Sequence, residues 1–120
     1  MGDISFARGD LYVFPFAVFI DDEQYTGTLD SIYFTVKKHY FDENPVFQKK
    51  LSDGSIIQNN DGTYTIRIEP EDTENLAFGT YDCDIQVEKS DDGVVQIKRT
   101  FFGKLKLFPE VTHAENESEA

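Results

Sequence analysis

The chain has 120 residues, 11 of them basic and 23 acidic, for a net charge of −12; 39% are hydrophobic and 14% aromatic. This length suits one domain with one core. The acidic balance argues strongly against a nucleic-acid-binding role, because phosphate contacts need clustered Lys and Arg.

Membrane and export signals are not expected. No segment approaches the roughly 18 apolar residues that a membrane span requires. The first ten residues contain no basic region followed by an apolar run, so we expect no secretory signal. The single cysteine, Cys83, cannot form an internal disulfide, which fits folding in a reducing cytoplasm.

Alternation of apolar and polar residues dominates the chain and predicts β-strands. Arg99 and Gly103 fall in the inward phase of the last strand and suggest a bulge or bend there. The residues expected to face inward are, in chain order, Tyr12, Phe14, Phe16, Val18, Ile20, Ile32, Phe34, Val36, Tyr64, Ile66, Ile68, Tyr81, Cys83, Ile85, Val87, Val95, Ile97, Phe101, Leu105 and Leu107.

Three Asp-Gly pairs, ending at Gly54, Gly62 and Gly93, punctuate the alternating runs. Glycine accepts the positive φ that tight hairpin turns need. These pairs predict short antiparallel connections between about residues 46 and 69, and again between 80 and 108. Short alternating strands at this spacing indicate an antiparallel sandwich or a small barrel.

One short helical turn is expected near residues 70–76, between two strands. Pro70 suits the first turn of a helix, and acidic Glu71 and Asp72 suit its positive N-terminus. Leu76 would then close the edge of the core. We expect a single β-sandwich domain over residues 3–110, followed by an acidic flexible tail over 111–120.

The second strand is apolar on the face that should be polar. Leu11, Val13 and Phe19 lie on this outward face, and Pro15 indicates an edge strand because it cannot donate to a ladder. A bare apolar edge is an aggregation hazard. Two explanations stay open, coverage by the N-terminal segment or the tail and contact with another subunit.

No motif in the chain supports catalysis or metal binding. Arg8-Gly9-Asp10 spells an adhesion tripeptide, but it leads directly into an apolar strand and reads as a turn. Neither Gly62 nor Gly93 aligns with calcium-loop ligand spacing. Cys83 lies on an apolar strand face, as a small buried hydrophobe rather than an activated thiolate. We expect a non-enzyme with no cofactor and no metal.

The order "FTVKK", "VFQKKLSDGSI", "DGTYTIRIEPEDTENL", "GTYDCDIQ" and "KLKLFPEVT" resembles small phage and prophage structural domains of Gram-positive hosts. It is similar to the N-terminal domain of baseplate upper proteins and related tail or fibre proteins, over residues 3 to 112. The resemblance implies an immunoglobulin-like β-sandwich that anchors virion parts, is made in the host cytoplasm, and contacts other virion subunits or itself.

Tyr81, two residues before Cys83, matches the corner tyrosine that immunoglobulin-type domains place at the start of strand F. A buried phenol needs a hydrogen-bond partner, so we expect its hydroxyl to bond to backbone near Glu71 or Asp72.

The alternative function is a carbohydrate-binding β-sandwich module. Exposed Tyr33, Tyr40 or Phe41 would serve as its stacking platforms.

Overall fold

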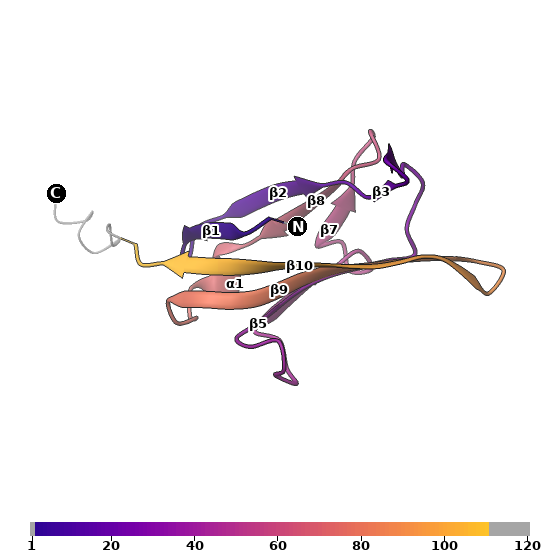
Figure 1. Ribbon diagram of the computed structural model, residues 1–120. Coiled ribbons are helices and arrows are strands. Elements are labelled where there is room, and N and C mark those ends of the chain that lie inside the picture. Colours follow the sequence, from indigo (N-terminus) through magenta and orange to yellow (C-terminus); the bar gives the residue numbers. More distant parts are fainter. Residues whose placement is uncertain (1, 111–120) are drawn as a thin grey trace.

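The computed structural model describes residues 2–110, so the expected tail over 111–120 lies outside the described residues. Within these residues the protein is all-β apart from one helical turn, as the alternation predicts (Figure 1). The elements are β1 (Ile4–Ala7), β2 (Tyr12–Phe16), β3 (Phe19–Ile20), β4 (Glu23–Gln24), β5 (Ser31–Lys37), β6 (Phe47–Lys50), β7 (Ile56–Gln58), β8 (Tyr64–Ile68), α1 (Pro70–Thr73), β9 (Gly79–Asp91) and β10 (Val94–Phe108).

The strands form a curled larger sheet in the order β1-β10-β9-β5-β6, a smaller sheet in the order β2-β8-β7, and a ribbon of β3 with β4. The expectation of purely antiparallel pairing is wrong at one edge, where β1 runs parallel to β10 with Ile4 opposite Leu105. The reason is the connection after β1. It carries the chain into the smaller sheet, so no hairpin forces β1 to run against its neighbour.

The two sheets bury one core between them. Phe34 of the larger sheet meets Phe14 of the smaller one edge-on, with ring centroids 5.6 Å apart. Most residues expected to face inward are buried or packed against this core. The largest fully buried side chains are Val18, Ile32, Phe34, Val36, Ile56, Tyr64, Ile66, Ile68, Ile85, Val87, Leu105 and Leu107.

The hairpin of β9 and β10 departs from the expected pattern near its tip. Val95 was expected to face inward but is 53% exposed. The pairing of β5 with β9 ends at Glu88, so the hairpin continues as a two-stranded arm with no sheet opposite it (Figure 1). The register shift lies between Val95 and Ile97, and the ladder runs regularly past Arg99 and Gly103, where a bulge was expected.

The Asp-Gly turns divide into two kinds. Gly62 and Gly93 have φ of +84° and +79° and close the β7–β8 and β9–β10 hairpins as predicted. The Asp53-Gly54 turn also has a positive φ, +83° at Gly54, but it joins strands of different sheets. The prediction of a hairpin at Asp53-Gly54 is therefore wrong. Ser55 accepts a 2.8 Å hydrogen bond from the Lys50 amide, which bends the chain away from β6.

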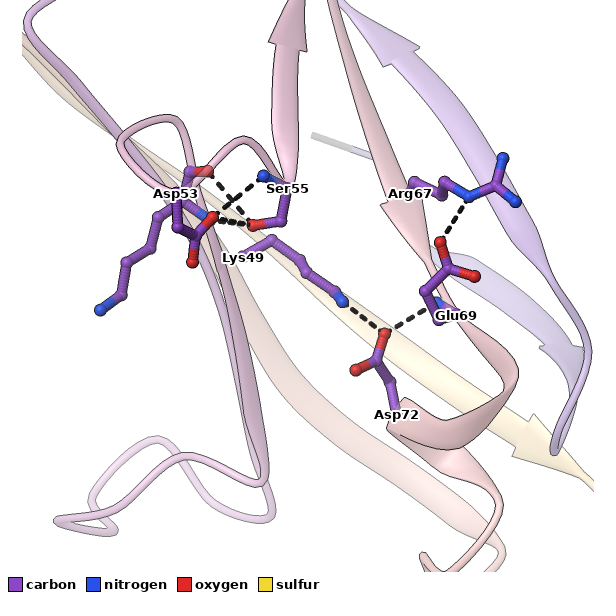
Figure 2. A network of polar contacts seen from close by, with 7 residues as sticks. Lys49, Asp53, Ser55, Arg67, Glu69 and Asp72 are labelled. Carbon is purple, nitrogen blue, oxygen red and sulfur yellow. Dashed lines mark hydrogen bonds and ion pairs between the residues drawn. The ribbon is translucent and has the colours of Figure 1, made fainter.

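The helical turn α1 is shorter than expected and is tied to the larger sheet. The Glu69 amide donates to Asp72 Oδ2 at 2.7 Å, which satisfies a free donor at the helix start. Lys49 of β6 faces inward and its Nζ lies 2.5 Å from the same carboxylate oxygen (Figure 2). This contact joins an edge strand of one sheet to the turn beside the other. Leu76 is partly buried against the core, as predicted.

The Arg8-Gly9-Asp10 triplet forms the turn between β1 and β2. Gly9 has φ +83°, and the Asp10 amide donates to the Ala7 carbonyl at 3.1 Å. Arg8 Nη1 donates to the Leu76 carbonyl, and the guanidinium lies 4.2 Å from the centre of the Phe78 ring. The arginine is thus held against the connection that follows α1.

No helix within the described residues is long and apolar enough to cross a membrane.

Candidate functional site

The outer face of the larger sheet carries a row of side chains that crosses four strands. The register places Phe102 of β10 opposite Asp84 of β9, Asp84 opposite Thr35 of β5, and Thr35 opposite Gln48 of β6. Paired residues of neighbouring strands point to the same face of a sheet. From β10 to β6 the row covers three interstrand spacings, about 14 Å.

This row forms the floor of a groove with a volume of about 860 Å³. The segment between β5 and β6 contributes Tyr40 and Pro45 to one wall. The charged residues around the floor are Asp3, Lys37, Glu43, Asp82 and Lys104. A concave site of this size is in the range that small ligands occupy.

Hydrogen bonds hold the wall in place. The Tyr40 amide donates to Asp82 Oδ2 of β9 at 2.8 Å, and the His39 amide donates to Asp42 Oδ2 at 3.0 Å. The His39 and Phe41 rings stack with centroids 5.1 Å apart. The wall is therefore anchored to the sheet that forms the floor.

Two of the four carboxylates that line the groove, those of Asp82 and Asp84, have different electrostatic surroundings. The Lys104 ammonium bonds to Asp82 and lowers the pKa of that carboxyl, and the same contact raises the pKa of Lys104. Burial instead raises the pKa of the Asp84 carboxyl, while a hydrogen bond from Gln86 and the charge of Lys37 partly offset the effect. Asp82 thus has both an ion-pair partner and a backbone hydrogen-bond donor, whereas one oxygen of Asp84 has no hydrogen-bond partner among the described residues.

The hydrogen bonding of the Asp84 carboxylate is incomplete among the described residues. Its Oδ2 accepts a long 3.4 Å bond from Gln86 Nε2, whereas its Oδ1 is buried and has no hydrogen-bond partner among the described residues. Next to it, Gln48 Nε2 donates to Thr35 Oγ1 at 2.8 Å, which fixes both side chains. The floor therefore offers a carboxylate acceptor, an amide and a hydroxyl beside an exposed aromatic ring.

The second surface of interest is the outer face of the smaller sheet. Leu11, Val13 and Phe19 are 47%, 45% and 55% exposed. β2 pairs only with β8 among the described strands and is an edge strand, as Pro15 predicted. The N-terminal segment does not cover this face, because β1 pairs with β10 in the other sheet.

The three apolar residues do not all lie on one strand. Val13 belongs to β2, Leu11 precedes it, and Phe19 lies in β3. Ile57 of the other edge strand, β7, is also exposed on this sheet, and sequence reasoning missed it because its run was too short to show alternation. The outer face of the smaller sheet thus carries apolar side chains at both edges.

Tyr81 lies at the corner entering β9 and is only 2% exposed. Its hydroxyl donates to the Ala77 carbonyl at 2.7 Å, so the acceptor expected near Glu71 or Asp72 is wrong. The helical turn ends at Thr73, and the chain has returned to the core edge by Ala77, which brings this carbonyl nearer. Burial raises the pKa of the Tyr81 phenol, and the bond to Ala77 partly offsets that effect.

Cys83 is buried on the inner face of β9, two residues beyond Tyr81. Burial, with the nearby carboxylates second, raises the pKa of its thiol to about 12. A thiol with so high a pKa carries almost no thiolate at neutral pH and is a poor nucleophile.

The aromatic platforms named from the sequence are only partly brought together. Tyr40 lines the groove, and Tyr33 lies on the same outer face one row away, opposite Gln86. Phe41 is exposed outside the groove lining. Sequence reasoning missed Phe102 and Asp84, although strict alternation around partly buried Phe101 and buried Cys83 places both on the outer face.

Within residues 2–110, no group of three His, Cys, Asp or Glu side chains is arranged to hold a metal ion. Neither a scan against protein-family models nor a search of curated proteins finds a match for the sequence.

Proposed function

We propose that the chain is a non-catalytic, immunoglobulin-like structural module of a phage or prophage virion, which assembles or attaches parts of a tail, baseplate or fibre. The proposal rests on the sequence resemblance, and one structural observation favours an assembly role. That observation is the exposure of three apolar residues on and near edge strand β2, with Val13 inside the strand, Leu11 just before it and Phe19 in the next strand, β3. Isolated exposed apolar residues are ordinary, whereas apolar residues gathered on an edge that no residue among 2–110 covers suggest a binding surface.

The strand order supports the immunoglobulin-like part of the proposal. Immunoglobulin-type domains place strands B, E and D in one sheet and G, F, C and C′ in the other. The same order results if β2, β8 and β7 are strands B, E and D, and β10, β9, β5 and β6 are strands G, F, C and C′. In this assignment Tyr81 occupies the corner between strands E and F, where its hydrogen bond to Ala77 matches the corner tyrosine.

The location that we propose is the virion, after synthesis in the cytoplasm of the bacterial host. An unbridged, buried Cys83 suits folding in a reducing compartment. The proposed partners are other virion subunits or further copies of this chain. The charge of −12 opposes close packing of copies, so a contact between them needs a surface that carries few charges. On the β2 face, Arg67 lies opposite Val13 and its charge is paired with that of Glu69.

The test is light scattering coupled to size-exclusion chromatography over a range of concentrations. We expect the chain to form a multimer that Val13→Lys dissociates. Val95→Lys is the matched control, since it adds the same charge at a similarly exposed valine on the hairpin arm. A chain that stays monomeric at every concentration would contradict self-association and restrict the proposal to a different virion subunit.

A carbohydrate-binding module remains the second candidate function. The observation that favours it is the groove on the larger sheet, because aromatic rings beside polar hydrogen-bonding side chains suit sugar rings. This surface lies on the opposite side of the molecule from the β2 face, so one chain can carry both functions.

A further inference from the structure

We propose that the groove on the outer face of the larger sheet is a binding site for a neutral oligosaccharide, with Phe102 as the stacking platform and Asp84, Thr35 and Gln48 as the hydrogen-bonding floor. This inference rests on the second candidate function and goes beyond it by naming the site and the ligand class. It is independent of the assembly role, which concerns the other sheet.

Two aromatic side chains that line the groove are highly exposed. Phe102 is 72% and Tyr40 is 77% exposed, and both line the groove. Two large rings in water cost free energy that burial against a ligand would recover. A sugar ring presents an apolar face of C–H groups to such a ring and keeps its hydroxyls at its edge.

The Asp84 carboxylate in the floor is only partly hydrogen-bonded. Its Oδ1 is buried without a hydrogen-bond partner among residues 2–110, although buried polar atoms are nearly always satisfied. A small rotation of this side chain toward the groove would let a sugar hydroxyl donate to Oδ1, and a hydrogen bond to a carboxylate is stronger than one between neutral groups. Asp84 is the direct register neighbour of Phe102, so one sugar residue can contact both.

Hydrogen bonds hold the polar side chains of the floor in fixed positions. The Gln48 amide donates to the Thr35 hydroxyl at 2.8 Å, which leaves the hydroxyl proton and the amide oxygen for a ligand. The bond from the Tyr40 amide to Asp82 fixes the wall above them. A site held by its own hydrogen bonds loses little conformational entropy when a ligand binds.

The charge of the groove disfavours one ligand class. The groove is lined by the carboxylates of Asp3, Glu43, Asp82 and Asp84 and by the ammonium groups of Lys37 and Lys104. An anionic polysaccharide would meet this excess of negative charge and a chain of net charge −12. A neutral ligand that both donates and accepts hydrogen bonds matches the polar side chains of the floor without that repulsion.

The length and direction of the floor indicate a chain rather than a monosaccharide. The row from Phe102 to Gln48 extends about 14 Å across the strands. A single sugar ring could contact only one end of it, whereas a short oligosaccharide laid across the strands could contact Phe102, Asp84 and Gln48 together.

The experiment is an NMR titration of the isotope-labelled full chain with four neutral hexasaccharides built from glucose in α or β linkage, mannose, or N-acetylglucosamine. Titration to about 10 mM would saturate a weak site with Kd near 1 mM. We expect at least one probe to give saturable amide shifts confined to the segments around Thr35, Tyr40, Gln48, Asp84 and Phe102.

Variants then distinguish specific binding in the groove from non-specific binding elsewhere on the protein. We expect Phe102→Ala to weaken binding at least about tenfold, because an aromatic anchor carries much of a contact. Asp84→Asn should also weaken it by removing the charged acceptor. The matched control is Phe108→Ala, which removes an exposed ring on the same face of the same strand, six residues away. It should leave the affinity unchanged.

Three results would overturn the proposal: no shifts with any of the four probes, shifts outside the groove, or equal losses in Phe102→Ala and Phe108→Ala. Binding of a Lys-rich peptide in the groove, without saccharide binding, would also overturn it and indicate a protein partner. None of these results changes the outcome of the Val13→Lys experiment, so failure here and failure of the assembly role are distinguishable.

Discussion

Replacing Tyr81 by Phe tests the corner that joins the helical turn to β9. The substitution keeps the ring and removes only the hydroxyl, whose hydrogen bond to the Ala77 carbonyl is 2.7 Å long. We expect the free energy of unfolding to fall, because the phenol is 2% exposed and the change leaves a carbonyl without its donor.

The size of the effect follows from where the two partners lie. A net intramolecular hydrogen bond contributes about 1 kcal/mol. Ala77 is an exposed residue, so water can reach its carbonyl in the variant and the cost should stay close to that figure. For a domain of this size, about 1 kcal/mol lowers Tm by roughly 4 °C.

The assay is equilibrium urea unfolding followed by circular dichroism, with thermal unfolding alongside. We expect the unfolding midpoint to fall by about 0.5 to 1 M urea, with the slope unchanged. Tyr40→Phe is the control, since its ring is exposed and surface changes usually stay within about 0.5 kcal/mol. Equal midpoints for Tyr81→Phe and the parent chain would refute the structural role of the corner hydrogen bond.

Three further predictions concern buried or half-buried polar groups. Tyr64→Phe should lower the free energy of unfolding by about 1 to 2 kcal/mol in urea. The Tyr64 hydroxyl accepts a hydrogen bond from the buried Leu29 amide at 3.2 Å and donates one to the Gly27 carbonyl at 3.3 Å. A loss of stability no greater than that of Tyr40→Phe would contradict this role. Asp84→Asn should stabilise the protein at pH 7. Burial raises the folded-state pKa of Asp84 above its ordinary 3.8 despite the nearby Lys37, so the stability this group contributes is complete below pH 3.8 and is lost as pH rises through the raised pKa. The gain should therefore vanish below pH 3.8, and a variant less stable at pH 7 would show that burial of the charge is not costly. Cys83, with a pKa of about 12, should react with a thiol reagent at pH 8 only after unfolding, and rapid labelling of the native chain would contradict its burial.

The difference between Asp82 and Asp84 illustrates what the sequence can show about the groove. Both are acidic residues on the outward face of a strand, and alternation assigns that face correctly. Only the register shows that Asp82 lies opposite Lys104, whereas Asp84 lies opposite Phe102 and Thr35. Cross-strand pairing depends on residues distant in sequence. The sequence of β9 alone therefore could not distinguish Asp84 from Asp82.

Lys49 illustrates the limit of the alternation argument. It lies in the inward phase of β6, where an apolar residue would be expected, and it is almost fully buried. Its partner, Asp72, comes from the helical turn and was predicted only as a favourable residue at a helix start (Figure 2). A charge of this kind is tolerated inside only where a partner from another element reaches it.

By itself, the sequence determined the all-β class, the alternating strands β2, β5, β8, β9 and β10, two of the three expected Asp-Gly hairpins, the helical turn and the edge position of β2. These features depend on alternation, φ preferences and the missing donor of proline, which act within a few residues. The tertiary structure alone decided the parallel pairing of β1, the acceptor of Tyr81, the sheet crossing at Gly54 and the groove. Each of these depends on which distant segments meet, and that is set by how the two sheets pack over their shared core.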